Sequence, residues 1–122
     1  MNDVATGTRA PLDLEGFRNS MQAAGIEEIV EPTLQLFVEE SDGLLTALEA
    51  SVATSDTEGL RKAAHKLKGS SGNVHARHLS ELAEGLEHLA CGGDLAPAGR
   101  LVAQARREYA AVRDFLTKQG VA

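Results

Sequence analysis

Apolar residues recur every three or four positions along four long stretches of the chain, and short polar or glycine-containing segments separate these stretches. This is the period of an amphipathic α-helix that turns one face toward a core. It predicts helices over residues 31–52, 57–74, 79–91 and 97–116. A shorter stripe of Leu14, Phe17 and Met21 predicts one more brief helix, from Asp13 to near Gly25, that caps the bundle. We therefore expect an all-α fold: an antiparallel up-down-up-down four-helix bundle with a short additional N-terminal helix.

The start of the second helix has two interpretations. Pro32 suits the first turn of a helix that begins near Glu31, where a missing backbone N–H costs little. A helix that begins near Glu27 and kinks at Pro32 is the alternative. Ile26 and Ile29 would extend its apolar stripe in the N-terminal direction.

Polar residues mark the starts of later helices. Asp56 or Thr57 suits the N-cap of the third helix. Asp94 is expected to cap the last helix, with Pro97 in its first turn. Residues 1–10 are short and polar and read as a flexible N-terminal tail, which leaves residues 11–120 as a single domain.

The third helix has two contrasting faces. One is apolar or small, with Leu60, Ala64, Leu67, Ser71 and Val74 at helical spacing. The other presents an imidazole among cations and glycines: Arg61, His65, Lys68, Gly69 and Gly72. An exposed helical glycine costs about 1 kcal/mol relative to alanine. The two glycines either clear space for a large partner to reach His65 or mark the fraying end of the helix.

Residues 64–74, which read AHKLKGSSGNV, resemble the signature of histidine-containing phosphotransfer (HPt) domains. The shared features are a histidine, a lysine three residues later, a glycine four residues later, small residues, and then a second amphipathic helix with Ala76 and Leu79. The resemblance extends from about Leu34 to about Leu116. His75 departs from it, because the family usually has glycine there, so the turn after the motif is expected to differ in shape.

The resemblance implies a role for each matching residue. His65 is the phosphoacceptor, which takes a phosphoryl group from an aspartate on a receiver domain, such as that of a hybrid sensor histidine kinase, and passes it to an aspartate of a response regulator. Lys68 lies near the phosphate, and Gly69 leaves space for the partner. Lys66, Arg61 and Gly72 are weaker candidates for charge support or docking.

The chain lacks sequence motifs for acting as a kinase by itself. It has no G-x-x-x-x-G-K-[ST] loop and no other glycine-rich nucleotide loop. It also has no evident carboxylate cluster for a metal ion beside His65. We expect a phosphocarrier without enzyme activity or a cofactor of its own, and the resemblance places the Mg²⁺ on the partner receiver domain.

Helix register suggests what orients the imidazole. If the chain turns near His75, His65 lies ten residues before the turn and Glu87 twelve residues after it, so antiparallel helices bring them to similar heights. A carboxylate there would fix the ring tautomer. Glu87, or as a second choice Glu84, is the orienting candidate, and a solvated glutamate is the alternative.

Charge excludes one broad function. The chain has 122 residues and a net charge of −6, and residues 20–59 contain nine acidic residues and no lysine or arginine. General nucleic-acid binding requires a basic footprint. The local basic cluster around His65 instead indicates an anion-attracting docking surface.

Cellular location follows from what the sequence lacks. Cys91 is the single cysteine, so no intrachain disulfide is possible, and a small residue near a helix end is the expected role. No apolar run approaches the roughly 20 residues of a membrane span, and the first residues do not form a secretory signal. We expect a cytoplasmic monomer without membrane insertion. A free-standing protein and a domain of a larger kinase both fit, and neither the upstream kinase, the downstream regulator nor the direction of flow follows from the sequence.

Two other functions fit parts of the pattern. A scaffold or inhibitory module of the same fold would bind a receiver domain or kinase without carrying phosphate. A metal-binding bundle would use His75 with His78, or Glu84 with His88, at spacings of three and four. The Glu-x-x-His pairs of di-iron bundles are missing, so exposed polar histidines are the simpler interpretation.

Overall fold

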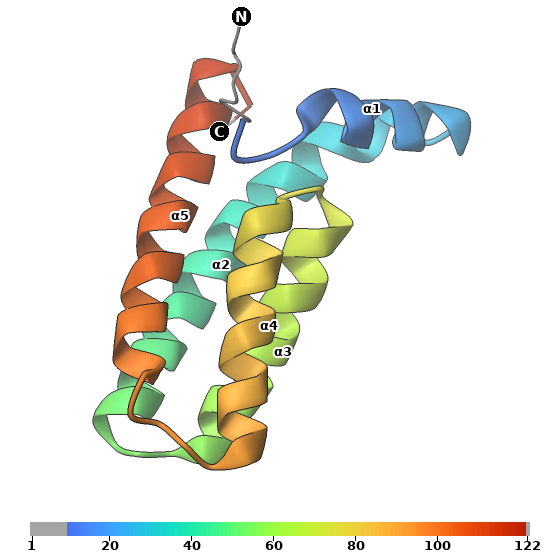
Figure 1. Ribbon diagram of the computed structural model, residues 1–122. Coiled ribbons are helices and arrows are strands. Elements are labelled where there is room, and N and C mark those ends of the chain that lie inside the picture. Colours follow the sequence, from blue (N-terminus) through green and yellow to red (C-terminus); the bar gives the residue numbers. More distant parts are fainter. Residues whose placement is uncertain (1–9, 122) are drawn as a thin grey trace, which may run out of the picture.

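The computed structural model describes residues 10–121, and most of the predicted N-terminal tail therefore lies outside the described residues. Its elements are α1 (Leu14–Ala23), the 3₁₀-helix η1 (Glu27–Ile29), α2 (Val30–Ala53), α3 (Thr57–Asn73), α4 (Arg77–Gly92) and α5 (Ala98–Lys118). In Figure 1, α2 to α5 stand side by side and alternate in direction, while α1 lies across one end. The predicted all-α bundle with an additional N-terminal helix is confirmed.

The predicted apolar stripes form most of the core. On α3, Leu60, Ala64, Leu67, Ser71 and the following Val74 are at most 1% exposed. Val38, Val52, Leu82, Leu89 and Leu101 are only partly buried and pack around the edge of the core. The prediction for Ile26 and Ile29 is wrong: each is 38% exposed, because the chain there forms a separate turn before α2 begins.

The residues predicted to start α2 and α3 do so, whereas those predicted to start α5 do not. Asp56 is the N-cap of α3, and its Oδ1 accepts a 2.9 Å hydrogen bond from the Gly59 amide. Pro32 lies in the first turn of α2, as expected. The expectation for α5 is wrong, because Pro97 occupies the N-cap position instead of the first turn. Asp94 accepts from the Ala96 amide at 3.1 Å, in the turn that precedes the helix.

His75 lies in the turn between α3 and α4 with φ of +65°. This left-handed conformation is the one that glycine adopts without steric cost. His75 therefore replaces the glycine of the signature, but its backbone has a conformation that suits glycine. The His75 ring also packs against Phe17 of α1, with 5.8 Å between ring centroids and a 57° angle between planes.

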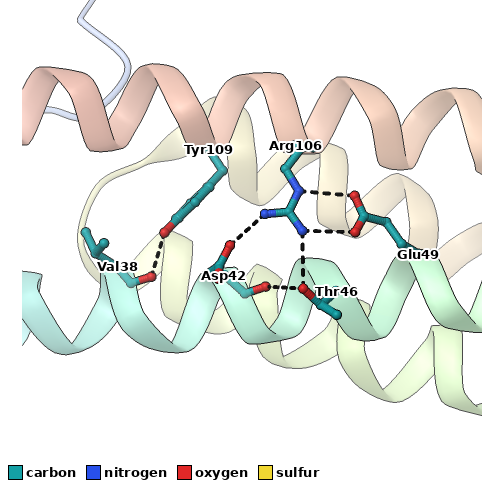
Figure 2. A network of polar contacts seen from close by, with 6 residues as sticks. All are labelled: Val38, Asp42, Thr46, Glu49, Arg106 and Tyr109. Carbon is teal, nitrogen blue, oxygen red and sulfur yellow. Dashed lines mark hydrogen bonds and ion pairs between the residues drawn. The ribbon is translucent and has the colours of Figure 1, made fainter.

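A polar network joins α5 to α2 (Figure 2). The Arg106 guanidinium donates to Asp42 Oδ1 at 2.7 Å and, from two nitrogens, to both carboxylate oxygens of Glu49 at 2.9 and 3.1 Å. The hydrogen bond from Arg106 lowers the pKa of Glu49, and Glu49 in turn raises the pKa of Arg106. One turn further along α5, the Tyr109 hydroxyl donates to the Val38 carbonyl at 2.8 Å. These contacts fix the register of α5 on α2.

Within residues 10–121, no helix is long and apolar enough to cross a bilayer.

Candidate functional site

His65 stands near the middle of α3, on the side opposite the buried stripe. Its side chain is 63% exposed, whereas Ala64 beside it is fully buried. Helix geometry explains the contrast, because adjacent residues on a helix point about 100° apart. The predicted open position of the imidazole is therefore present.

Glu87 of α4 approaches the inner edge of the His65 ring. Its Oε2 lies 2.8 Å from His65 Nδ1, and its side chain is only 15% exposed. The contact joins residues 22 positions apart, which the antiparallel arrangement of α3 and α4 brings to the same height. The predicted pairing of His65 with Glu87 is present. Glu84, the second choice, is exposed on α4, and among residues 10–121 it is Glu87 that bonds to the ring.

The contact decides which ring nitrogen faces outward. Lys68 and then His65 lower the pKa of Glu87 through their polar contacts, so its carboxylate is ionised near neutral pH. An ionised carboxylate only accepts hydrogen bonds, so Nδ1 of His65 must carry the proton. In the neutral ring, Nε2 then has the free lone pair and points away from Glu87.

Lys68 lies on the side of α3 that faces Glu87 of α4. Its Nζ is 3.0 Å from Glu87 Oε1, an ion-pair distance at angles outside those of a directed hydrogen bond. This contact with Glu87 raises the pKa of Lys68. The carboxylate therefore has His65 on one oxygen and Lys68 on the other.

Ser80 is a site residue that sequence reasoning missed. Its hydroxyl donates to the Lys68 carbonyl at 2.9 Å and so ties α4 to α3 beside the site. Its distance from the α3–α4 turn could have identified it. Ser80 lies five residues after His75 and Lys68 lies seven before it, so antiparallel helices bring the two to similar heights.

The remaining cations are less closely associated with His65. Arg61 donates to both oxygens of Glu58 at 2.7 and 3.0 Å, and this contact raises the pKa of Arg61. Lys62 is 4.0 Å from the same carboxylate. Arg61 and Lys68 are thus each paired with a carboxylate, while Lys66 is exposed beside His65.

The two glycines of the motif have different surroundings. Both lie inside α3, which continues to Asn73. A Cβ added at Gly69 would meet nothing within 4 Å, so the surface beside His65 is open there. A Cβ at Gly72 would lie 3.4 Å from the Ser80 hydroxyl, so Gly72 faces the contact with α4. A methyl group at Gly69 would therefore enter open space, whereas one at Gly72, which is also exposed, would make an ordinary van der Waals contact with Ser80. A role for Gly72 in partner access stays a prediction.

The other histidines lie apart from this arrangement. His78 Nδ1 is 3.7 Å from Glu81, and His88 is exposed. Across residues 10–121, no three histidine, cysteine, aspartate or glutamate side chains are grouped closely enough to hold a metal ion. Cys91 is exposed near the end of α4.

Several known proteins are similar to this chain in sequence or in structure. Residues 32–115 match the family model of the Hpt domain. Eighty residues are 26% identical to the aerobic respiration control sensor protein ArcB of Escherichia coli (strain K12) and of Shigella flexneri. That match covers 66% of this chain but only 10% of ArcB, so the chain corresponds to about a tenth of those relatives.

A solved structure is similar over nearly the whole chain. The crystal structure of histidine-containing phosphotransfer protein B (HptB) from Pseudomonas aeruginosa PAO1 is 32% identical, with a TM-score of 0.83. The similarity covers 93% of this chain and 96% of that one. Together with the family match over residues 32–115, it shows that this chain belongs to the Hpt domain family, the phosphotransfer modules of phosphorelays.

Proposed function

We propose that His65 accepts a phosphoryl group from an aspartyl phosphate on one receiver domain and passes it to an aspartate on another. The observation that carries this proposal is an exposed imidazole whose inner nitrogen is held by a shielded carboxylate at 2.8 Å. A ring held in this way presents one nucleophilic nitrogen in a fixed direction. Fixed positioning supplies much of the rate in phosphoryl transfer.

The chemistry needs only the lone pair of Nε2. In the forward step this lone pair attacks the phosphorus, the bond from phosphorus to the aspartate oxygen breaks, and the carboxylate leaves. The ring keeps its Nδ1 proton and takes a formal positive charge, which Glu87 stabilises. Transfer to the second aspartate reverses these bond changes, so the module ends in its starting state.

The surroundings of His65 fit a large protein partner. The open surface at Gly69 allows a receiver domain to reach Nε2. Lys68 and Lys66 supply positive charge for the phosphoryl oxygens. The Mg²⁺ ion is expected to come with the receiver domain, whose aspartate it would coordinate.

We assign the donor as the receiver domain of a hybrid sensor histidine kinase and the acceptor as that of a response regulator. The similarity to part of a sensor protein supports this pairing. The module would act as a carrier that binds no nucleotide. Its expected partners are therefore receiver domains, and it is expected to function as a monomer.

Labelling from a receiver domain tests the site. A purified receiver domain, phosphorylated with ³²P and supplied with Mg²⁺, is mixed with wild type, His65→Gln or His78→Gln protein. We expect acid-labile, base-stable label on wild type and on His78→Gln and none on His65→Gln. Equal labelling of His65→Gln and wild type would falsify the assignment. Tight receiver binding without any label would instead identify a scaffold.

A further inference from the structure

Lys68 and His65 share one carboxylate. Glu87 Oε1 faces Lys68 Nζ at 3.0 Å, and Oε2 faces His65 Nδ1 at 2.8 Å. Oε1 is shielded from solvent. Lys68 is therefore the cation that neutralises Glu87 while the imidazole is uncharged.

Phosphorylation at Nε2 would redistribute these charges. The ring becomes positive and is already in contact with Glu87, so it can replace Lys68 as the counter-charge. The phosphoryl group brings negative charge to the outer side of the ring, where a cation is then needed. Lys68 starts three residues from His65, about one helical turn, and its flexible side chain is 34% exposed.

We propose that Lys68 is a mobile counter-ion, which pairs with Glu87 in the unphosphorylated protein and moves to the phosphoryl group when His65 is phosphorylated. This inference rests on the proposed function of His65. Lys68 acts here as a positioning residue. Part of the attraction between Lys68 and the phosphoryl group is offset by the contact with Glu87 that Lys68 gives up.

A double-mutant cycle on the phosphorylation equilibrium tests the exchange. Wild type, Lys68→Gln, Glu87→Gln and the double variant are each treated with phosphoramidate and excess ammonium chloride. The Nε2 lone pair displaces ammonia, and ammonia reverses the step, so ³¹P NMR gives the equilibrium fraction of phosphohistidine. We expect Lys68→Gln to lower the equilibrium constant further in the Glu87→Gln background, by up to about fivefold more than in wild type. An equal or smaller effect there would overturn the mobile counter-ion.

Two further variants separate the possible causes. Lys66→Gln makes the same charge change at the exposed neighbour of His65, and its effect should be the same with Glu87 or Gln at position 87. If the effect of Lys66→Gln also depends on position 87, any nearby positive charge couples to Glu87, which would contradict an exchange specific to Lys68. His65→Gln should give no phosphohistidine signal. A phosphohistidine signal from His65→Gln would contradict the proposed function itself. If His65→Gln gives no signal but Lys68→Gln has the same effect in wild type and in Glu87→Gln, only the exchange is contradicted.

A direct measurement on wild type needs no variant at position 87. The ¹³Cε and ¹⁵Nζ resonances of Lys68 should move on phosphorylation by phosphoramidate, and those of Lys62 should not. Unchanged Lys68 resonances in a protein whose ³¹P spectrum shows phosphohistidine would overturn the exchange.

Discussion

The Asp13 amide donates a 3.0 Å hydrogen bond to the His75 carbonyl, and so ties the chain just before α1 to the turn between α3 and α4. Phe17 of α1 adds a ring contact to the same histidine. His75 thus holds α1 across the end of the bundle, although its φ of +65° is one that residues other than glycine seldom adopt.

Two substitutions at position 75 should separate backbone strain from ring packing. His75→Gly and His75→Ala both remove the contact with Phe17, but only glycine also relieves the left-handed conformation. We expect the glycine variant to be more stable than the alanine variant by about 1 kcal/mol, measured by urea unfolding. Equal stability would show that the turn relaxes and that position 75 carries no strain.

Gly69→Ala should stabilise the protein and slow phosphotransfer. The new methyl group would meet nothing within 4 Å, and alanine favours a helix by about 1 kcal/mol over glycine. In the proposed function, the same methyl group would occupy space that a receiver domain needs in order to reach His65. Thermal unfolding and transfer rates from a phosphorylated receiver domain measure the two effects.

Gly99→Ala is the control. Gly99 lies in the first turn of α5, at the opposite end of the bundle from α1. Its added methyl group would make only an ordinary 3.8 Å contact with Val52. It should change stability without changing the transfer rate. Gly69→Ala with an unchanged transfer rate would contradict the role of this glycine in access.

Ser41→Ala should also stabilise the protein. Ser41 is completely buried, and its hydroxyl has no hydrogen-bond partner among residues 10–121. Ser71 is equally buried, but its hydroxyl donates to the Leu67 carbonyl at 2.6 Å. Both changes to alanine gain helix propensity, but only Ser71→Ala also loses a hydrogen bond. The unfolding free energy of Ser41→Ala should therefore exceed that of Ser71→Ala by about 1 kcal/mol. The reverse order in urea unfolding would contradict this account.

Arg106→Gln should destabilise the protein by about 1 kcal/mol at neutral pH and low salt, because it leaves Asp42 and Glu49 without their shared cation. Arg106 lowers the pKa of Glu49 in the folded protein. The network therefore stabilises the fold fully above the ordinary glutamate pKa near 4.3. This stabilisation is lost as the pH falls through the lower pKa that Glu49 has in the folded protein. The difference between wild type and variant should therefore shrink below about pH 4.

The exposed Arg107→Gln is the comparison for this change. It should cost little stability at any pH. An Arg106→Gln effect that persists undiminished at pH 3 would point to lost packing of the side-chain stem instead of lost charge.

The sequence predicts the fold and the central pair of the site for a simple geometric reason. Periodic apolar stripes define each helix, and the short turn at His75 fixes the relative heights of α3 and α4, so residues at similar distances from the turn meet. His65 and Glu87 obey this rule. The pairing of Arg61 with Glu58 follows from an equally simple rule, because residues three apart lie next to each other on a helix.

Other features depend on relationships that no local pattern contains. Arg106 lies 57 residues from Glu49, and their contact requires the register of α5 on α2. The surroundings of Gly72 depend on how closely α4 approaches α3. Ile26 and Ile29 fit a helical stripe by spacing, but a separate 3₁₀ turn rotates them toward solvent.

Because Nδ1 of His65 is in contact with Glu87, the proposed transfer would have to pass through a single atom, Nε2. Two receiver domains could not both reach one nitrogen, so in the proposed function the donor would have to depart before the acceptor binds. Steady-state relay through this protein would then follow ping-pong kinetics, and a high concentration of either receiver would inhibit the flow by occupying the wrong form of the carrier.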